Sequence, residues 1–216
     1  MLSSSLTSER LWVDGKLAHA YEWSGGTVTV WDSARNMLLV IELFQDEAFT
    51  PDEKADLLLR MLFPYQDEVD PEHFDTMLIE VLWDACGLDL DGSHESAADG
   101  PQAFDWVEDA GRIRASLQMA YSADWDDLSR RLSFAEVCDL LGMLVESEQR
   151  TPFADAVAYR VAKTPDRAKY GDDYVDAWLE RRDYYRLHRD PTKEEQTRAD
   201  QKLTDLFNSL WEATRE

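Results

Sequence analysis

Short motifs that begin helices recur along this chain, and apolar residues at helical spacing follow each of them. The motifs start at Thr50, Asp70, Ser133 and Thr151. Thr50 and Ser133 are each followed three residues later by a glutamate, the pattern of a capping box, in which both side chains accept hydrogen bonds from backbone N–H groups of the first turn. Proline directly follows Thr50, Asp70 and Thr151, and proline suits the first helical position. We therefore expect short capped helices, each burying one apolar stripe.

The spacing of the apolar residues predicts where these helices lie and which residues form the core. Helices are expected over residues 33–46, 50–62, 71–87, 104–121, 133–147, 151–163, 171–188 and 191–214. The side chains expected in the core are Leu38, Ile41, Phe44, Leu58, Leu62, Phe74, Leu78, Val81, Ile113, Leu117, Phe134, Val137, Leu141 and Leu144.

Residues 10–31 have a different pattern, typical of short strands. Asp14-Gly15 is a strong signal for a tight hairpin turn, and Ser24-Gly25-Gly26 is a second turn signal. The turns separate three short segments rich in β-branched and aromatic residues, which predicts a small antiparallel meander. Three short strands are only marginally stable alone, so this sheet is expected to pack against helices.

These patterns predict a mainly α (α+β) fold, a helical bundle with a small N-terminal antiparallel β element. We expect one domain over residues 1–165 and a helical extension over residues 166–216, where much of the positive charge lies. Within the domain, the acidic, Gly- and Pro-containing segment 88–103 is expected to be a flexible loop.

The strongly negative charge of the chain makes some classes of binding partner less favourable than others. It contains 22 Lys and Arg against 45 Asp and Glu, a formal net charge of −23. Such a charge disfavours nucleic acids and anionic membranes as partners, and it favours basic ones. No segment is apolar over the length of a membrane span, and no signal peptide is visible. Cys86 and Cys138 lie in no metal or redox motif, so we expect free thiols in a cytoplasmic protein.

The residues that carry most enzymatic chemistry do not form a recognisable constellation. The four histidines have no metal-ligand spacing, and no phosphate-binding or nucleophile motif is present. Asp89 and Asp91 begin a pattern like a calcium loop, but the later positions do not fit it. Asp124, Asp126 and Asp127 cluster three carboxylates, for which a surface acidic turn is favoured over a catalytic pair. We expect no enzymatic activity, no cofactor and no metal.

The stretch 104–128, FDWVEDAGRIRASLQMAYSADWDDL, is the most distinctive part of the chain. On a helix, Trp106, Ile113 and Leu117 share an apolar face, while Glu108, Asp109 and Arg112 are placed on a solvated one. Glu108 and Arg112 have the spacing of a helical ion pair. A core helix with a charged outer face accounts for these residues without any catalytic role.

An ordered set of motifs is similar to the bacteriophage Gp15-like family, which is grouped with phage tail assembly chaperones. The resemblance covers about residues 10–165, with Leu117, Ser122 and Ser133-Phe134 as departures from the family pattern. The motifs that carry it are VDGK (13–16), SARNMLLVIELFQDE (33–47), DEKADLLLRMLFP (52–64), FDTMLIEVLWDACG (74–87), FDWVEDAGRIRASLQMAY (104–121), DWDDL (124–128), LSFAEVCDLLGML (132–144) and FADAVAYRVAKTP (153–165).

The resemblance implies a non-enzymatic role in phage assembly, in the cytoplasm of a bacterial host. Such a chaperone or adaptor binds the tape-measure protein and the tail-tube protein, and it needs no cofactor. The apolar stripe of the last expected helix is a candidate for partner binding or self-association, or it packs on its own domain; it consists of Leu203, Phe207, Leu210 and Trp211.

Two other function classes stay open at this point. The first is an acidic decoy that mimics DNA and binds a basic host protein, which requires acidic side chains in a continuous run along one face. The second is an enzyme with a dispersed site that uses the carboxylates of residues 124–127 and a histidine. Arginines mixed among the acids count against the decoy, and the enzyme requires a pocket beside those carboxylates.

Overall fold

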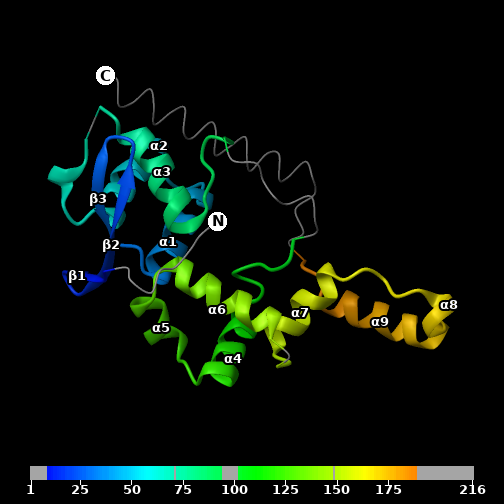
Figure 1. Ribbon diagram of the computed structural model, residues 1–216. Coiled ribbons are helices and arrows are strands. Elements are labelled where there is room, and N and C mark those ends of the chain that lie inside the picture. Colours follow the sequence, from blue (N-terminus) through cyan, green and yellow to red (C-terminus); the bar gives the residue numbers. More distant parts are fainter. Residues whose placement is uncertain (1–8, 71, 94–101, 148, 189–216) are drawn as a thin grey trace. The chain divides into compact units, whose positions relative to one another are not determined.

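The computed structural model describes residues 9–70, 72–93, 102–147 and 149–188. Over these residues the chain forms three strands, nine α-helices and one short 3-10 helix (Figure 1). This confirms the expected mainly α fold with a small N-terminal antiparallel sheet. The described residues divide into two compact units, the first from residues 9–93 and Asp126–Asp139 and the second from residues 102–125 and 140–188.

The sheet of the first unit is the predicted meander, with its strands in sequence order. It consists of β1 (Leu11–Val13), β2 (Lys16–Trp23) and β3 (Gly26–Val30), all antiparallel. Asp14 and Gly15 both have positive φ, 51° and 73°, as the two central residues of a type I′ hairpin turn require.

Helices of the first unit begin and end largely where their capping residues predict. They are α1 (Ala34–Gln45), α2 (Pro51–Leu62), α3 (Phe74–Cys86) and α5 (Trp125–Arg131), joined by the 3-10 helix η1 (Gln66–Glu68) and by the first residues of α6 (Phe134–Glu146). Both capping boxes are present, at Thr50 and at Ser133. Gly87 ends α3 with a φ of 70°, in the left-handed region.

Two elements of the first unit differ from the prediction. Helix α3 begins at Phe74 and not directly after Asp70, because the Asp70 carboxylate accepts hydrogen bonds from the Glu72 N–H and the His73 ring in a turn before the helix. Helix α5 occupies the stretch expected to be an acidic turn, and Asp126 and Asp127 lie in its first turn, where carboxylates favour helix formation.

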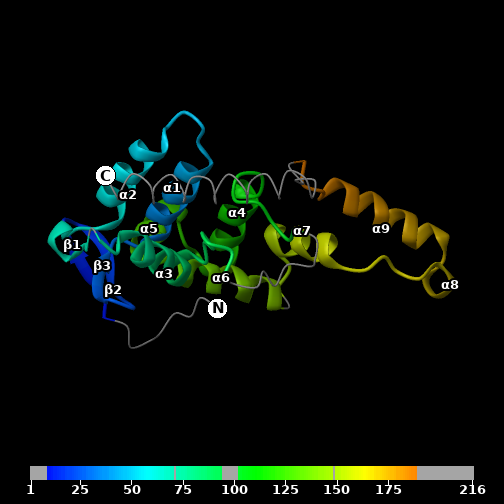
Figure 2. The ribbon, with the colours of Figure 1, turned by 90° about the horizontal axis from the view of Figure 1, so that it is seen from above.

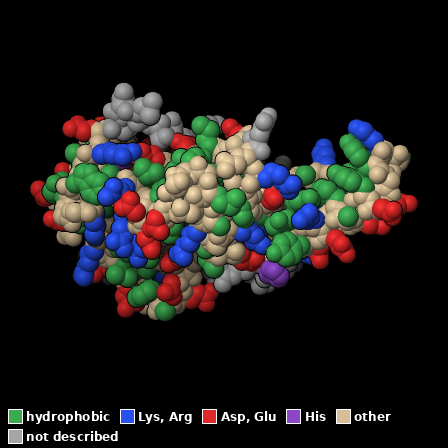
Figure 3. Space-filling view, turned by 90° about the horizontal axis from the view of Figure 1, so that it is seen from below, with side chains coloured by type: hydrophobic (Ala, Val, Ile, Leu, Met, Phe, Trp, Pro, Cys, Tyr) green, Lys and Arg blue, Asp and Glu red, His purple; other side chains and the backbone are tan. Residues whose placement is uncertain are grey.

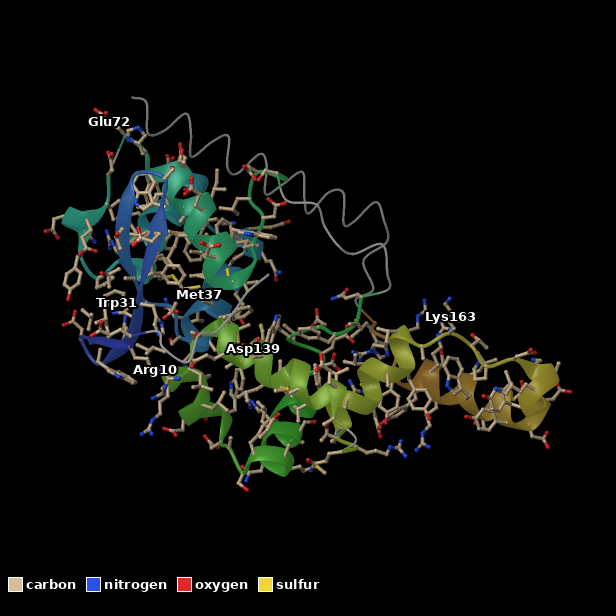
Figure 4. The ribbon with its side chains drawn as sticks, in the orientation of Figure 1. Arg10, Trp31, Met37, Glu72, Asp139 and Lys163 are labelled. Carbon is tan, nitrogen blue, oxygen red and sulfur yellow. The ribbon has the colours of Figure 1, made fainter. Side chains whose placement is uncertain are left out.

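The core of the first unit combines the sheet with the inner faces of the helices. Figure 4 shows Trp31 beside the sheet and Met37 on α1, both of them buried. Leu38 and Ile41, which were expected in the core, are only half-buried, because α1 turns Val40 and Leu43 inward instead. The other side chains expected in the core of both units are buried: Phe44, Leu58, Leu62, Phe74, Leu78, Val81, Ile113, Leu117, Phe134, Val137, Leu141 and Leu144.

Backbone hydrogen bonds join distant segments of the first unit. The Ala34 N–H donates to the Leu132 carbonyl at 2.9 Å, and the Phe134 N–H donates to the Asp32 carbonyl at 3.1 Å. The amide of Asn36 donates to the carbonyls of Trp31 and Met61, at 2.6 and 2.8 Å. The start of α1 is therefore fixed both to the end of α2 and to the start of α6.

The second unit contains α4 (Ala110–Tyr121), α7 (Pro152–Val161), α8 (Arg167–Tyr170) and α9 (Asp172–Tyr184), with the later part of α6. Thr151 caps α7 as predicted, by accepting from the Ala154 N–H. The Ser116 hydroxyl of α4 accepts from the Phe153 N–H at 2.9 Å, so α4 is tied to the first turn of α7. The segment between α7 and α8 runs alongside α9 in both views (Figures 1 and 2).

Helix α4 begins at Ala110, six residues later than the predicted helix 104–121. The Asp105 carboxylate accepts from the N–H groups of Val107 and Glu108, both at 2.8 Å, which holds residues 105–108 in a turn. Asp109 was placed on the solvated face by the helical period, but its side chain is fully buried. Arg112, expected to pair with Glu108, donates to Asp109 at 2.7 Å.

The reason for the burial of Asp109 is an ion pair with Arg160 of α7. Both guanidinium Nη atoms donate to the carboxylate, at 2.6 and 2.9 Å, and Arg160 also donates to the carbonyls of Ala103 and Tyr185. Burial by itself raises the pKa of Asp109, but the hydrogen bonds from Arg160, from the Asp105 N–H and from Arg112 hold that pKa below its ordinary value. The carboxylate is therefore ionised inside the second unit.

Three further expectations concern the whole chain. The boundary at residue 165 stays a prediction; within the described residues, α9 belongs to the same unit as α4 and α7. Residues 88–93 form no helix or strand, and half of the expected acidic loop 88–103 lies outside the described residues. None of the helices in the described ranges combines the length and the apolar character that crossing a bilayer requires.

We predict that Asp109→Asn destabilises the second unit by about 3 to 5 kcal/mol, because it leaves the buried Arg160 charge without its counter-charge. The matched control is Arg150→Gln, which removes the exposed ion pair with Asp155 and is expected to cost at most about 1 kcal/mol. Urea unfolding followed by far-UV circular dichroism measures both free energies of unfolding. Equal losses in the two variants would contradict this account of the ion pair.

Candidate partner-binding surface

The residues proposed from the sequence for partner binding lie outside the described residues. Leu203, Phe207, Leu210 and Trp211 belong to the segment 189–216, so their role stays a prediction. Candidate sites on the described part of the chain therefore come from the side chains that the fold itself brings together.

The acidic cluster of the dispersed-site hypothesis is spread over the surface around α5. Asp126 pairs with Arg35 at 3.6 Å and Asp127 with Arg131 at 2.9 Å, and all four side chains are exposed. Asp124 precedes the helix and is also exposed. None of the three carboxylates lines either of the two grooves described below. Acid–base catalysis requires a carboxylate in a pocket, whereas these three side chains are exposed on the surface.

A second titratable cluster, His19, Tyr21 and Asp32, lies at the sheet of the first unit. His19 and Tyr21 are two residues apart on β2, so their side chains leave the same face of the sheet. The His19 Nδ1 atom lies 2.8 Å from an Asp32 carboxylate oxygen, and the Tyr21 hydroxyl donates to the same oxygen at 2.8 Å. The Asp32 side chain is 1% exposed and that of His19 14%. The cluster connects β2 to the segment before α1.

The surroundings of this cluster favour a structural ion pair. The hydrogen bond to Asp32 raises the pKa of His19 above its ordinary value; burial opposes this, and the charges of Asp32 and Glu136 add to it. Glu136 itself pairs with Arg10, which Figure 4 labels. Burial raises the pKa of the Tyr21 hydroxyl, and the negative charge of Asp32 raises it further by a smaller amount. A protonated histidine that holds a buried aspartate accounts for these contacts.

The cysteines and the metal-binding side chains add no further site on the described residues. Cys86 and Cys138 are free thiols, and burial raises the pKa of each to about 12, so neither is a reactive thiolate near neutral pH. In the described ranges, no three side chains of the metal-ligating types come together in a way that would hold an ion.

Helices α8 and α9 of the second unit form a surface of a different kind. Only Val175 of α9 is buried, whereas Tyr170, Tyr174, Leu179 and Tyr184 are all exposed. We name these four exposed side chains the aromatic surface. Arg167 pairs with Asp172 and Asp176, at 3.0 and 2.6 Å, and thereby holds the short α8 against the first turns of α9. The rings of Tyr170 and Tyr174 stack at 5.3 Å.

Helix α9 combines many charged side chains with residue types that are frequent at protein interfaces. Tyr, Trp and Arg are the residues that most often dominate binding energy between proteins, and α9 has all three types. Figure 3 shows hydrophobic, basic and acidic side chains interspersed over the part of the second unit that carries α8 and α9. The aromatic surface is therefore the best candidate for partner binding on the described residues.

Sequence reasoning expected a helix over 171–188 but missed its surface. The helix is confirmed, over Asp172–Tyr184. A regular apolar stripe was the signal used to propose a binding element, and α9 has none. The signal in the sequence is the frequency of aromatic and arginine residues over 170–186 without a regular apolar stripe.

Two grooves accompany these elements. One, in the second unit, has a volume of about 510 Å³, a size in the range of ligand sites. We name it the arginine groove; it is lined by Gln102, Arg160, Leu179, Arg182, Asp183, Arg186 and Leu187. The other lies in the first unit, along α3, and has a volume of about 420 Å³. Its lining is mostly uncharged or acidic: Thr76, Ile79, Glu80, Trp83, Asp84, Asp91 and Ser93.

The His19 ion pair predicts a specific pH dependence of stability. Because the folded-state pKa of His19 is raised, its contribution is complete below the unfolded pKa of about 6.5 and is lost as the pH rises through the folded value. His19→Gln is therefore expected to lower the free energy of unfolding by roughly 1 kcal/mol near pH 6 and to flatten its decline toward about pH 9. Urea unfolding across this range measures both effects.

His73→Gln is the matched control, because His73 also pairs with an aspartate but its side chain is 59% exposed. It is expected to leave the pH dependence of the wild-type chain in place. If the free energy of unfolding declined identically with rising pH in the wild-type and His19→Gln chains, His19 would not be the source of the pH dependence.

The comparisons with known proteins agree with the motif order seen in the sequence. A family model described as Bacteriophage Gp15 protein matches residues 13–187. No curated protein and no solved structure matches the chain. The family match extends from the first hairpin turn through α9, so it includes the aromatic surface and the arginine groove. The chain therefore belongs to the bacteriophage Gp15 family, which indicates a structural or assembly-related phage protein.

Proposed function

We propose that this chain is a non-enzymatic tail assembly chaperone or adaptor, which binds the tape-measure protein of its phage and aids assembly of the tail-tube protein around it. Membership of the Gp15 family supports a role in the phage particle or its assembly. The observation that carries the finer proposal is the aromatic surface, because α9 presents Tyr174, Leu179 and Tyr184 to solvent and buries only Val175.

The physical argument concerns the cost of leaving such a helix without a partner. Exposed aromatic rings and leucine gain free energy when a partner covers them, and Tyr loses little conformational entropy on binding because it has few rotatable bonds. A long helical client that is prone to aggregate offers apolar stripes of its own, which match such a surface. The acidic exterior of the chaperone then keeps the complex in solution.

The rival function classes have less support. On the face seen in Figure 3, acidic side chains are interspersed with basic ones, whereas a DNA mimic requires acidic groups in a continuous run. The carboxylates of an enzymatic site, Asp126 and Asp127, are exposed and paired with arginines on the surface. Both observations leave the assembly role with more support than either rival.

The decisive experiment is co-expression of the chain with the tape-measure protein from the same phage genome. We expect the tape-measure protein to stay soluble and to co-purify with the chain, whereas alone it aggregates, as light scattering records. Tyr174→Ala together with Tyr184→Ala is expected to weaken the complex by about tenfold or more, because exposed tyrosines often act as binding hot spots.

Tyr65→Ala is the matched control, since Tyr65 is an exposed tyrosine of the first unit, outside the aromatic surface. It is expected to leave co-purification unchanged. A tape-measure protein that aggregates whether or not the chain is present, with nothing co-purifying, would exclude the chaperone proposal. A complex that the double variant and the control retain equally would keep the proposal and move the binding surface elsewhere.

A further inference from the structure

We infer that the arginine groove of the second unit binds an acidic helical segment of a partner protein. The inference rests on the proposed function, because it names the chemistry that the client must present. It concerns a surface next to the aromatic surface, lined on one side by α9. Three arginines line the groove and one aspartate, Asp183, opposes them. Such a concentration of positive charge is notable in a chain whose net charge is −23.

The inner wall of the groove is rigid because Arg160 is fixed on all sides. Its guanidinium donates to the Asp109 carboxylate and to the carbonyls of Ala103 and Tyr185, and its side chain is only 5% exposed. A guanidinium held in this way cannot turn to meet a ligand, but it gives the groove a fixed shape and a fixed charge. Preorganised charge of this kind costs little further ordering when a ligand binds.

The cluster behind this wall pairs two guanidinium groups with one carboxylate. Arg160 and Arg112 both donate to Asp109, so two guanidinium groups share one carboxylate. Arg112 also lies over the ring of Tyr185, with 5.5 Å between the guanidinium carbon and the ring centroid. Asp109 therefore balances one of the two positive charges, and Arg112, whose side chain is 29% exposed, is partly screened by solvent.

The outer wall supplies the side chains that can move to a ligand. Leu179 and Arg182 lie three residues apart on α9, so they share one face of that helix, and Arg186 follows the helix end; all three line the groove. Arg182 donates to the Thr164 hydroxyl at 3.2 Å and lies over the ring of Trp178, which leaves several of its five N–H groups for a ligand. Within the described residues, Arg186 is exposed and forms no ion pair.

The groove combines these donors with apolar side chains, and this combination selects the type of ligand. Leu179 and Leu187 are the apolar members of its lining. Arginine binds a carboxylate through two parallel N–H groups, which gives both strength and direction. A helix that presents Glu or Asp beside Leu satisfies both kinds of contact, in the mode in which an amphipathic helix lies in a groove.

Nucleic acid would present the same negative charge, but the whole chain opposes it. At physiological salt, charges more than about 8 Å apart are largely screened, so a short acidic segment responds mainly to the groove. A nucleic acid continues past the groove over surfaces that carry the net charge of −23, and its binding strength depends on many phosphate contacts. The groove is therefore matched to a carboxylate-bearing peptide.

The test uses the full chain and fluorescence anisotropy with three labelled probes. The first is a helical peptide of about 18 residues with Leu at helical spacing and Glu on either side of that stripe. The second has Lys in place of every Glu, and the third is a single-stranded DNA of the same net charge as the first. We expect the Glu peptide alone to bind the wild-type chain.

Charge reversal in the groove provides the matched pair of variants. Arg182→Glu with Arg186→Glu is expected to weaken binding of the Glu peptide by at least about tenfold and to create binding of the Lys peptide. Arg130→Glu with Arg131→Glu makes the same change of charge on exposed arginines of α5, in the first unit, and is expected to alter the affinity by less than about twofold. Circular dichroism confirms that both variants are folded.

Three results would overturn the inference: no binding of the Glu peptide up to about 1 mM, equal weakening in both variants, or tighter binding of the DNA through the same arginines. If the Glu peptide binds equally well without the groove arginines while the tape-measure protein still co-purifies, the inference fails and the proposed function stands. If the Glu peptide requires these arginines but the tape-measure protein does not co-purify, the groove binds acidic helices and the proposed function fails.

Discussion

The second unit depends on the ion pair between Asp109 and Arg160. Removing two charges from water is costly, and the attraction between them offsets that cost only with good geometry and with partners for the remaining donors. Here the carboxylate receives both Nη atoms of Arg160, and the remaining contacts of the guanidinium go to the carbonyls of Ala103 and Tyr185. One side chain of α7 thus joins the turn before α4 to the residues that follow α9. The same contacts form the inner wall of the arginine groove, so the fold of this unit and its candidate site share one interaction.

In the first unit, backbone hydrogen bonds join segments that are distant in the sequence. Residues 32–34 pair with residues 132–134 through the N–H groups of Ala34 and Phe134, although about a hundred residues separate the two segments. Asp32 adds its side chain to the same region by binding His19 and Tyr21 of β2. A carboxylate that is almost inaccessible to water requires such donors, because an ionised group without them would be expelled from the interior or neutralised. The sheet, which is too small to be stable alone, is thereby fixed to the helices.

How well the sequence predicted each element depends on how local its interactions are. The capping boxes at Thr50 and Ser133 and the turn at Asp14-Gly15 involve groups within a few residues, so their residue types were enough. Asp109 was misplaced because its partner, Arg160, is 51 residues away and no period reveals it. Leu38 and Ile41 were misplaced for a related reason, since which face of α1 is inward depends on its neighbours. At the candidate site, α9 was expected as a helix, but the grouping of Arg160 with Arg182 and Arg186 required the tertiary structure.

An acidic chain with a small basic groove can distinguish a short acidic partner from an extended one, which a uniformly charged chain cannot do. The net charge of −23 repels polyanions and other copies of the chain at long range, which limits unwanted contacts in a crowded cell. At the groove itself, however, three arginines oppose one aspartate, and charges farther away than a Debye length are largely screened. If the groove binds an acidic helix as proposed, specificity arises from both parts: the groove attracts a short acidic segment, and the rest of the surface rejects partners whose negative charge extends further. The aromatic surface beside it then supplies apolar contact area, which charge alone does not provide.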